Sequence, residues 1–548
     1  MKAPSRRRFL RDTALGLAST LSLPGCSNQS SPGDWRALLG LAPPPCSGGF
    51  VGQRYDRGHL LRSARSLTPD ETKRTAVAII GAGIGGLAAA RALQRRGIDD
   101  YRLFELEDEA GGNSRGGSVA GYACPWGAHY LPLPGPHAED VAELLTEYGL
   151  RRETNGRVEY DETQLCHSPQ ERLYIDGGWQ DGLLPVRGQT AAAFADYRAF
   201  AQRVREVAKP GAFAIPTSAS QWNAELTALD QLSFAAWLDQ QQLQHPALRW
   251  YLDYCCRDDY GASSNAVSAW AGLHYFASRH GFSAPGDESE PDQDFGHDGV
   301  LTWPEGNAHL ARRLAAPHTD RTQTAALVLR VEESKHGVEV DVLDLSTQRL
   351  CRWQAQRVIF ATPLFIAARL HTAPPPALRD AATLIPHAPW LIANLYIDAP
   401  LKALAGNASL SWDNVIYNGA GLGYVNATNQ STLPYAGPTV LTYYHALGDN
   451  PAAGRRTLVD RNWDEWRQHI LIDLATAHPD LPSKLRQLEI MRYGHAMAIP
   501  APGVRSSTAL AALREGSKRI AYAHSDLSAY SVFEEALHWG LRAGVSIV

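Results

Sequence analysis

The chain has 548 residues, 44% hydrophobic and 20% charged, which is the composition of an ordinary globular protein with a large core. Its formal net charge of -5 gives no basic surface of the kind that binds nucleic acid. The seven cysteines include no CxxC pair, so neither a metal site nor a thioredoxin-like motif is predicted. Beyond the first 26 residues no long apolar run occurs, so the body of the protein is not expected to span a membrane.

Residues 1–26 have the layout of an export signal: a basic start, a short apolar run and small residues near a cleavage site. The apolar run from Thr13 to Leu23 has about half of the roughly 20 residues that a spanning helix needs. The stretch SRRRFLR at 5–11 resembles the twin-arginine signal, which implies export to the periplasm in the folded state. The alternative is an ordinary signal with additional arginines.

The stretch LPGC at 23–26 resembles a bacterial lipobox, which would place a lipid anchor on Cys26. The alternative is an ordinary signal end with a chance cysteine. Residues 27–73 are rich in Pro, Gly, Ser and Arg and are expected to form a tether and an irregular arm.

A β-α-β unit is predicted from residue 75 to residue 106. A β-branched apolar run ends in a glycine turn, an alanine-rich helix follows and stops at Gly97, and YRLFEL forms a second strand. The turn fits GxGxxG at Gly81, Gly83 and Gly86, with Gly85 beside them. Such glycines allow a tight turn, close approach of a pyrophosphate, and close packing of helix on strand. The helix N-terminus supplies N–H groups for the phosphates, and Glu105 at the next strand end can bind ribose hydroxyls.

Further along the chain, helical patterns are predicted at 138–150, 191–208, 233–243 and 246–258, and 280–299 reads as an acidic surface loop. Strands are predicted within 325–363, with a turn at 335–337, and within 390–447. Amphipathic helices are predicted at 463–479 and at 532–544, the last one ending at Gly544. The stretch NGAGLGY at 418–424 looks like a second glycine loop, but Tyr424 replaces its third glycine and no helix follows. We therefore expect a turn there and no separate NADPH domain.

The stretch ELEDEAGGNSRGG at 105–117 adds a second glycine pair, Gly111 and Gly112. Here the chain resembles the flavoprotein superfamily of amine oxidases, phytoene desaturases and protoporphyrinogen oxidases. Later stretches resemble the same superfamily in the same order: PWGAHYLP (125–132), WPEGNAHLARRLA (303–315), LVLRVEE (327–333), RVIFATP (357–363) and the closing segment 518–544.

The resemblance implies an α/β fold in which a Rossmann-like FAD-binding domain (74–150, 300–370 and 505–548) is interleaved with an α+β substrate domain (151–299 and 371–504). FAD is the implied cofactor. The implied cofactor-binding residues are Gly81, Gly83, Gly85, Gly86, Glu105, Gly111, Gly112, Asn113, Arg115, Tyr130, Val328 and Asp526.

Two departures from the family pattern stand out. The closing segment reads Ala523-His524-Ser525-Asp526, where the family has Ala-Gly followed by an acidic residue. The stretch 387–400 offers Ile392 and Asn394, where many amine oxidases hold a lysine near the flavin. The missing lysine puts the oxygen reactivity of the reduced flavin in question, so the electron acceptor stays open between oxygen and a quinone.

His129, His495 and Tyr530 are the catalytic candidates, each with a packing role as its alternative. Trp412 and Asp413 could line the same cavity, whereas Glu534 and Glu535 open a helix, where the dipole favours carboxylates. The resemblance implies an FAD-dependent oxidoreductase that takes a hydride from a C–N or C–C bond of a small molecule, an amine being favoured. The alternatives are a desaturase-like dehydrogenase with a quinone acceptor, and a flavoprotein that does not oxidise its substrate, such as a mutase-like isomerase or a structural FAD binder.

Overall fold

The computed structural model describes residues 45–62, 68–166, 170–209, 211–279, 281–286, 299–402, 411–430 and 437–547. The predicted export signal, Cys26 and residues 27–44 lie outside the described residues, as does most of the stretch 280–299. None of the helices among the described residues combines the length and the apolar character that crossing a bilayer requires.

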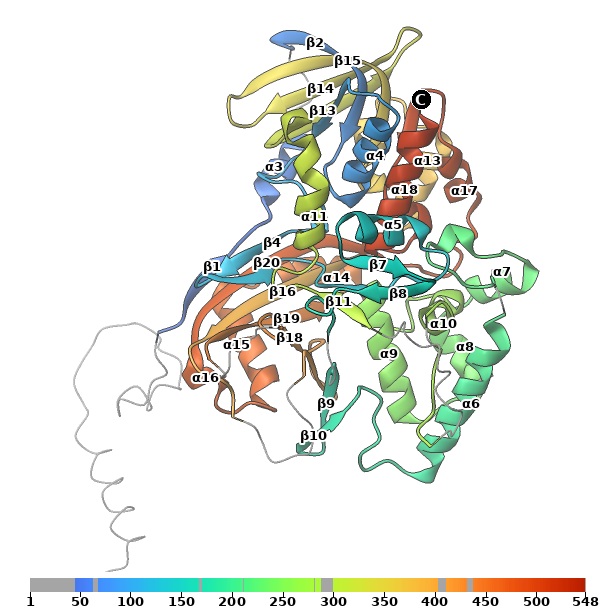
Figure 1. Cartoon of the computed structure of the whole chain (residues 1–548), viewed down its shortest axis with the longest axis vertical. Coiled ribbons are helices and arrows are strands. Elements are labelled where there is room, and N and C mark those ends of the chain that lie inside the picture. Colours follow the sequence, from blue (N-terminus) through green and yellow to red (C-terminus); the bar gives the residue numbers. More distant parts are fainter. Residues whose placement is uncertain are drawn as a thin grey trace, which may run out of the picture. The chain divides into compact units, whose positions relative to one another are not determined.

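Two large sheets organise the described chain (Figure 1). The first has seven strands in the order β12-β3-β2-β15-β14-β13, with β21 beside β15. Their bounds are β2 (Glu71–Ile80), β3 (Tyr101–Phe104), β12 (Thr322–Gln323), β13 (Ala326–Glu333), β14 (Val338–Asp344), β15 (Arg349–Phe360) and β21 (Ile520–Tyr522). β2, β3, β12, β15 and β21 pair in parallel, whereas β13 and β14 are antiparallel, so the sheet is mixed as predicted.

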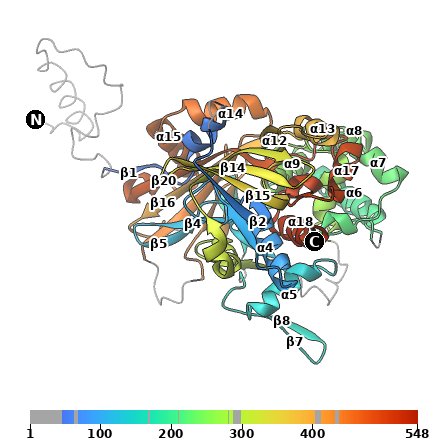
Figure 2. The ribbon, with the colours of Figure 1, turned by 90° about the horizontal axis from the view of Figure 1, so that it is seen from above.

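Helices cover both faces of the first sheet because its central strand is apolar on both sides. Val77 and Ile79 of β2 join one core cluster, and Ala78 and Ile80 join another. The first cluster contains α4 (Ile84–Arg95), α5 (Glu139–Glu147), α11 (Ala308–Ala315) and α18 (Phe533–Ser546). The second contains α12 (Leu364–Leu370), α13 (Pro376–Leu384) and α17 (Thr508–Glu515). Figures 1 and 2 show α4 and α18 side by side, although more than 400 residues separate them in the chain.

The second sheet has eight strands in the order β1-β20-β16-β19-β18-β17-β9-β10. Their bounds are β1 (Ser47–Phe50), β9 (Glu171–Ile175), β10 (Gly178–Asp181), β16 (His387–Ile397), β17 (Asp413–Ile416), β18 (Tyr424–Asn426), β19 (Thr439–Ala446) and β20 (Leu485–Ala498). Residues of β16 alternate between two cores. Leu391 and Leu395 belong to a core that also contains side chains of α14 (Pro451–Asp460), α15 (Trp463–Ala475) and α16 (Leu481–Lys484). Trp390 and Ile392 belong to the core on the opposite side of the sheet.

A helical layer packs against that opposite side. It consists of α6 (Ala191–Val207), α7 (Ala224–Asp230), α8 (Phe234–Gln240), α9 (Pro246–Tyr260) and α10 (Ala269–Ala277). Three small sheets have two strands each: β4 (Gly116–Val119) with β5 (Tyr122–Pro125), β6 (Tyr130–Pro132) with β11 (Val300–Thr302), and β7 (Arg151–Thr154) with β8 (Arg157–Tyr160). The short helices are α3 (Tyr55–His59) and the 3-10 helices η1 (Leu60–Arg62), η2 (Gly112–Ser114), η3 (Thr217–Ala219), η4 (Ala316–Arg321) and η5 (Ser525–Ser528).

Most of the predicted elements are present, with two corrections. Part of the expected irregular arm is regular, because β1 pairs in parallel with β20 and α3 follows it. The last helix does not end at Gly544 but continues to Ser546, since Gly544 packs against the Ala89 carbonyl of α4 rather than turning the chain. The stretch 418–423 lies in the connection between the antiparallel strands β17 and β18, as predicted, and Tyr424 is the first residue of β18. The proposed division into FAD-binding and substrate domains stays a prediction.

Candidate active site

The first glycine loop joins the end of β2 to the start of α4. Gly81 has a φ of +100°, a left-handed conformation that favours glycine. A Cβ at Gly86 would lie 2.0 Å from the Gly81 carbonyl oxygen, and one at Gly85 would lie 2.0 Å from that of Ala523. Gly83 is the N-cap residue of α4 and has no side chain that could accept from the first N–H groups of the helix. These N–H groups can therefore donate to a ligand such as phosphate.

The second glycine pair lies against the first loop. The Gly111 N–H donates to the Ala82 carbonyl at 2.8 Å, and Gly83 and Gly111 form an isolated parallel bridge. A Cβ at Gly112, whose φ is +56°, would come within 3.0 Å of the Gly83 Cα. The two loops therefore form one cradle that side chains would fill.

Carboxylates lie beside this cradle. Glu105 is buried, and its oxygens accept hydrogen bonds from the Ala82 and Glu107 N–H groups at 2.8 and 3.0 Å. Burial raises the pKa of Glu105. Glu107 Oε2 lies 3.9 Å from Arg115 Nη1 and has no hydrogen-bond partner among the described residues. The unpartnered Glu107 oxygen is an acceptor for ribose hydroxyls, and the N–H groups at the start of α4 are donors for phosphates, so the cradle fits the phosphate and ribose half of FAD. The contact of Glu105 with a ribose stays a prediction.

Asp526 is fully buried in η5, beside the start of α12. Its carboxylate accepts from the Leu364 N–H at 2.8 Å and lies 3.2 Å from His387 Nε2 and 3.1 Å from His524 Nδ1. Burial by itself would raise the pKa of Asp526, but His524 and His387 together hold it well below the usual range. Val328 is buried in β13, opposite Val342 of β14. The contacts of these two residues with ribityl chain and adenine stay predictions.

A cavity opens where the start of α18 meets the last turn of α9 and the second sheet. It is lined by Asn113, Gly127, Ala128, His129, Tyr130, Pro132, Asp258, Asp259, Arg279, Asn307, Trp390, Ile392, Tyr444, Tyr493, Ala496, Met497, Ser531, Val532, Phe533 and Glu534. We call it the central cavity. Three of the residues predicted for the site line it, namely Asn113, His129 and Tyr130. The C-terminal part of β20 and the start of α18 line it as well.

One wall of the central cavity is aromatic. The His129 ring stacks on Tyr444 with the centroids 4.3 Å apart, and it contacts Tyr130 and Trp412 at 5.0 and 5.4 Å. Burial lowers the pKa of His129 to about 3, so its imidazole is neutral at physiological pH. Ile392 adds an apolar side chain to this wall, whereas Asn394 is fully buried and bonded to the Pro125 carbonyl and to Thr442. No cationic side chain enters the cavity from β16.

The other wall is charged. Arg279, which follows α10, pairs with Asp259 at 3.2 Å and donates to the Tyr530 hydroxyl at 2.6 Å. Tyr530 in turn donates to Asp259 at 2.7 Å, so this candidate is buried behind the wall and holds the Arg279–Asp259 pair. Asp258 and Glu534 also line the cavity, and burial raises the pKa of each to about 7.

His495 is not brought into the central cavity. Its ring packs against Phe365 at 4.7 Å and lies 6.2 Å from His387, while its neighbours Ala496 and Met497 line the cavity. Burial lowers the pKa of His495 to about 4. A contact of His495 with substrate therefore has no support from the geometry.

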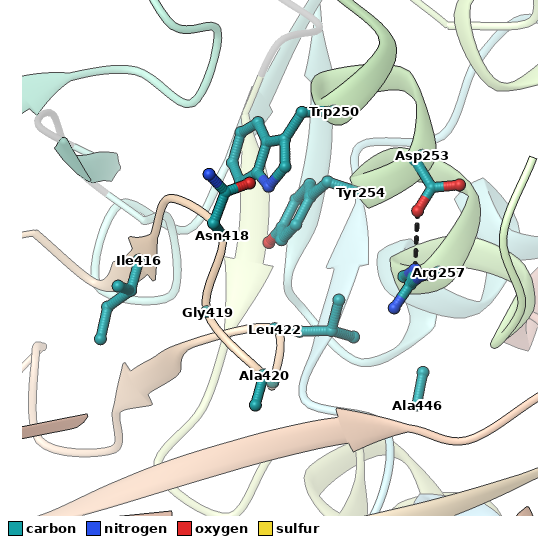
Figure 3. A pocket seen from close by; sticks show the side chains of 11 residues that line it. Trp250, Asp253, Tyr254, Arg257, Ile416, Asn418, Gly419, Ala420, Leu422 and Ala446 are labelled. Carbon is teal, nitrogen blue, oxygen red and sulfur yellow. Dashed lines mark hydrogen bonds and ion pairs between the residues drawn. The ribbon is translucent and has the colours of Figure 1, made fainter. Parts of the chain in front are cut away.

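A second cavity lies beside α9, between Trp250, Asp253, Tyr254 and Arg257 and the connection 418–422 (Figure 3). Asp253 accepts from Arg257 at 2.7 Å, as the dashed line shows. The N–H groups of Ala420 and Gly421 both donate to Asp473. They are therefore not free for phosphate, which agrees with the expectation that this glycine-rich stretch is no second nucleotide loop.

The sequence interpretation missed Asp258, Asp259 and Arg279, and it assigned Glu534 to the helix dipole alone. Two aspartates in the last turn of α9 oppose the dipole of that helix, and this is the signal that could have pointed to them. Glu535, by contrast, is structural, because it is fully buried and accepts from the Thr217 N–H and from Ser528 at 2.5 Å.

Comparisons with known proteins agree with this geometry. The family model described as flavin-containing amine oxidoreductase matches residues 84–547. Among solved structures, putrescine oxidase bound to putrescine has a TM-score of 0.62 at 18% identity, covering 87% of this chain and 99% of that one. Cyclohexylamine oxidase from Brevibacterium oxydans has a TM-score of 0.62 at 18% identity, covering 86% and 98%. At this identity the two structures show the fold, which is the predicted amine-oxidase-like two-domain α/β fold.

Curated relatives align over short segments only. A flavin-containing monoamine oxidase named AofH, from Mycobacterium tuberculosis, is 42% identical over 74 residues, which are 14% of this chain and 15% of that protein. A tryptophan 2-monooxygenase from Allorhizobium ampelinum is 52% identical over 46 residues, 8% of this chain and 6% of that protein. The match of the family model over most of the chain confirms the predicted class, an FAD-dependent oxidoreductase. The chain belongs to the family of flavin-containing amine oxidoreductases.

Proposed function

We propose that this protein oxidises a small organic amine at its C–N bond in the central cavity. The observation that carries the proposal is the pairing of an aromatic, uncharged wall with a carboxylate wall in one cavity at the start of α18. The family match and the fold support the same reaction.

Bound FAD would supply the acceptor for the hydride and its two electrons. The hydride leaves the carbon next to nitrogen, a proton leaves the nitrogen, and the C=N bond that forms is hydrolysed by water to a carbonyl compound and an amine or ammonia. The protein's part is to hold the cofactor at the glycine cradle and to orient the substrate. His129, Tyr444 and Trp390 exclude water from the face where the C–H bond breaks.

The electron acceptor that regenerates the cofactor is oxygen or a quinone. Ile392 lines the cavity in the stretch where many amine oxidases hold a lysine near the flavin. The apolar side chain in place of an ammonium group supports slow reaction of the reduced flavin with oxygen. We further propose that the protein is exported already folded by the twin-arginine route, with FAD loaded in the cytoplasm, and that Cys26 carries a lipid anchor. The support is the leader itself, SRRRFLR followed by LPGC, together with a cofactor cradle that exists only in the folded chain.

The proposal is tested by anaerobic titration of the flavin-loaded protein with a panel of amines, followed by admission of air. Loss of the visible flavin absorbance with an amine supports oxidation at a C–N bond, and the rate at which air restores it separates an oxidase from a dehydrogenase. If no amine bleaches the flavin, the desaturase-like or non-oxidative alternatives replace it. For export, replacing Arg6 and Arg7 by Lys should abolish delivery to the periplasm; unchanged delivery contradicts the twin-arginine route.

A further inference from the structure

The carboxylates of the central cavity are unequally compensated. Asp259 has a full complement of partners, because Arg279 and Tyr530 both bind it. Asp258 and Glu534 line the same cavity, and among the described residues no side chain donates to either of them. Glu534 is only 5% exposed, so its carboxyl group faces the cavity rather than bulk solvent. One cavity therefore holds three carboxyl groups, Asp258, Asp259 and Glu534, and a single guanidinium, Arg279, which is bonded to Asp259 and acts on the other two through its charge alone.

A second observation shows that the cavity is built for a polar ligand. Asn307 is 1% exposed and lines the cavity, and its amide nitrogen donates to the Tyr130 carbonyl at 2.9 Å. Its amide oxygen has no hydrogen-bond partner in the described structure. A buried acceptor is rarely left without a donor, so a ligand N–H or O–H is its expected partner.

We propose that the substrate carries two or more amino groups, a diamine or polyamine, and that Asp258 and Glu534 bind the ammonium group that is not oxidised. This inference rests on the proposed oxidation of an amine. The nitrogen that reacts must lose its proton before the C=N bond forms, whereas a second nitrogen stays charged and adds a cation to a cavity that has more carboxyl groups than cations. Asp258 and Glu534 would then set specificity.

The same charge balance disfavours an amino acid as substrate. A substrate carboxylate needs a cation, and Arg279 is the single cationic side chain among the described residues that line the central cavity. Arg279 is already held by Asp259 and Tyr530, and its Nε is the one donor without a partner in the described part of the chain. Two further carboxyl groups, neither of them bonded to a cation there, would repel a substrate anion.

The test compares 1,4-diaminobutane, a longer polyamine, butylamine and an α-amino acid as substrates of the flavin-loaded enzyme and of Asp258→Asn. We expect the wild type to prefer the diamine or polyamine over butylamine by about 10- to 100-fold in kcat/KM, the range of a charged hydrogen bond. Asp258→Asn should lower kcat/KM for the diamine much more than for butylamine, mainly through a higher KM for the diamine, so that most of the preference is lost. Asp253→Asn, on the same helix but facing the second cavity, is the matched control and should keep the preference.

A second readout does not depend on turnover. Because each of the two carboxyl groups has a pKa of about 7, binding a cation should expel protons at pH 7. Calorimetry of anaerobic diamine binding in buffers of different ionisation enthalpy measures this release, and Asp258→Asn should reduce it. If butylamine or the amino acid is oxidised as efficiently as the diamine, or if Asp258→Asn keeps the preference, the inference is overturned while amine oxidation stands. If no amine bleaches the flavin, the proposed function itself is overturned.

Discussion

Gly540 of α18 lies directly against the Gly85 carbonyl oxygen of α4: a Cβ built on Gly540 would come within 2.2 Å of it. The same Cβ would lie 2.6 Å from the Ala88 side chain. The closing helix therefore packs backbone to backbone on the helix whose N-terminus is the predicted pyrophosphate site. We expect cofactor binding and the docking of the C-terminal helix to be coupled through this contact.

Gly540→Ala tests that contact. The added methyl group must push α18 away from α4, and overpacking of this kind costs about 1–3 kcal/mol. We expect a lower Tm and a lower ratio of bound FAD to protein after purification. Gly135→Ala is the control, because a Cβ there meets no atom within 4 Å. Equal Tm values for the two variants would contradict the close packing.

Asp526→Asn tests the buried carboxylate between two histidines. Its pKa is held well below the usual range, so its contribution to stability is fully present above about pH 4 and is lost progressively as the pH falls from there toward the folded value. We expect the variant to be less stable at pH 7 by about 1.5–3 kcal/mol, the contribution of a charged hydrogen bond. The difference in Tm between wild type and variant should shrink below about pH 4. A difference that stays constant down to pH 3 would contradict the ionised state.

His129→Phe separates packing from acid–base catalysis. The imidazole stacks on Tyr444 and has a pKa of about 3, so it has no proton to give above pH 5. A phenyl ring keeps the stacking, and we expect kcat/KM to stay within about tenfold of wild type, less than the loss of a general acid or base causes. The pH profile between 5 and 9 should keep its shape. Loss of one limb of that profile would make His129 a proton-transfer group instead.

Asp258→Asn should stabilise the protein in the absence of substrate. The folded-state pKa of Asp258 is raised to about 7, so its ionised form destabilises the fold. That cost is absent below about pH 4, grows as the pH rises toward 7 and is constant above it. We expect the variant to have the higher Tm at pH 8 and the same Tm at pH 4. Asp253→Asn should show the opposite sign at pH 8, because Asp253 pairs with Arg257 at 2.7 Å.

Local patterns made much of the fold predictable. The strand, glycine turn and helix from 75 to 97 depend on neighbouring residues, and their bounds follow from the apolar run and from the glycines. The pairing of β1 with β20 could not be predicted in the same way. Ser47 pairs with Gln487, and a strand of four residues carries no signal for a partner so far along the chain.

The candidate site was predictable in part for the same reason. Asn113 lies in the glycine-rich stretch 105–117, His129 and Tyr130 lie in the stretch 125–132, and all three line the central cavity. Asp258, Asp259 and Arg279 belong to no motif, and their role depends on where α9 and α10 pack against the start of α18. His495 was predicted as a catalytic candidate, but its ring packs on Phe365, whereas its neighbours Ala496 and Met497 line the cavity.

The most direct test of the central claim is a single anaerobic turnover of the flavin-loaded protein with a primary amine that bleaches it. The carbonyl product and the ammonia released are both measured against the amount of flavin bleached. Oxidation at a C–N bond predicts one carbonyl group and one ammonia for each flavin reduced. Bleaching without ammonia would place the reaction at a C–C bond and would contradict the assignment as an amine-oxidising enzyme.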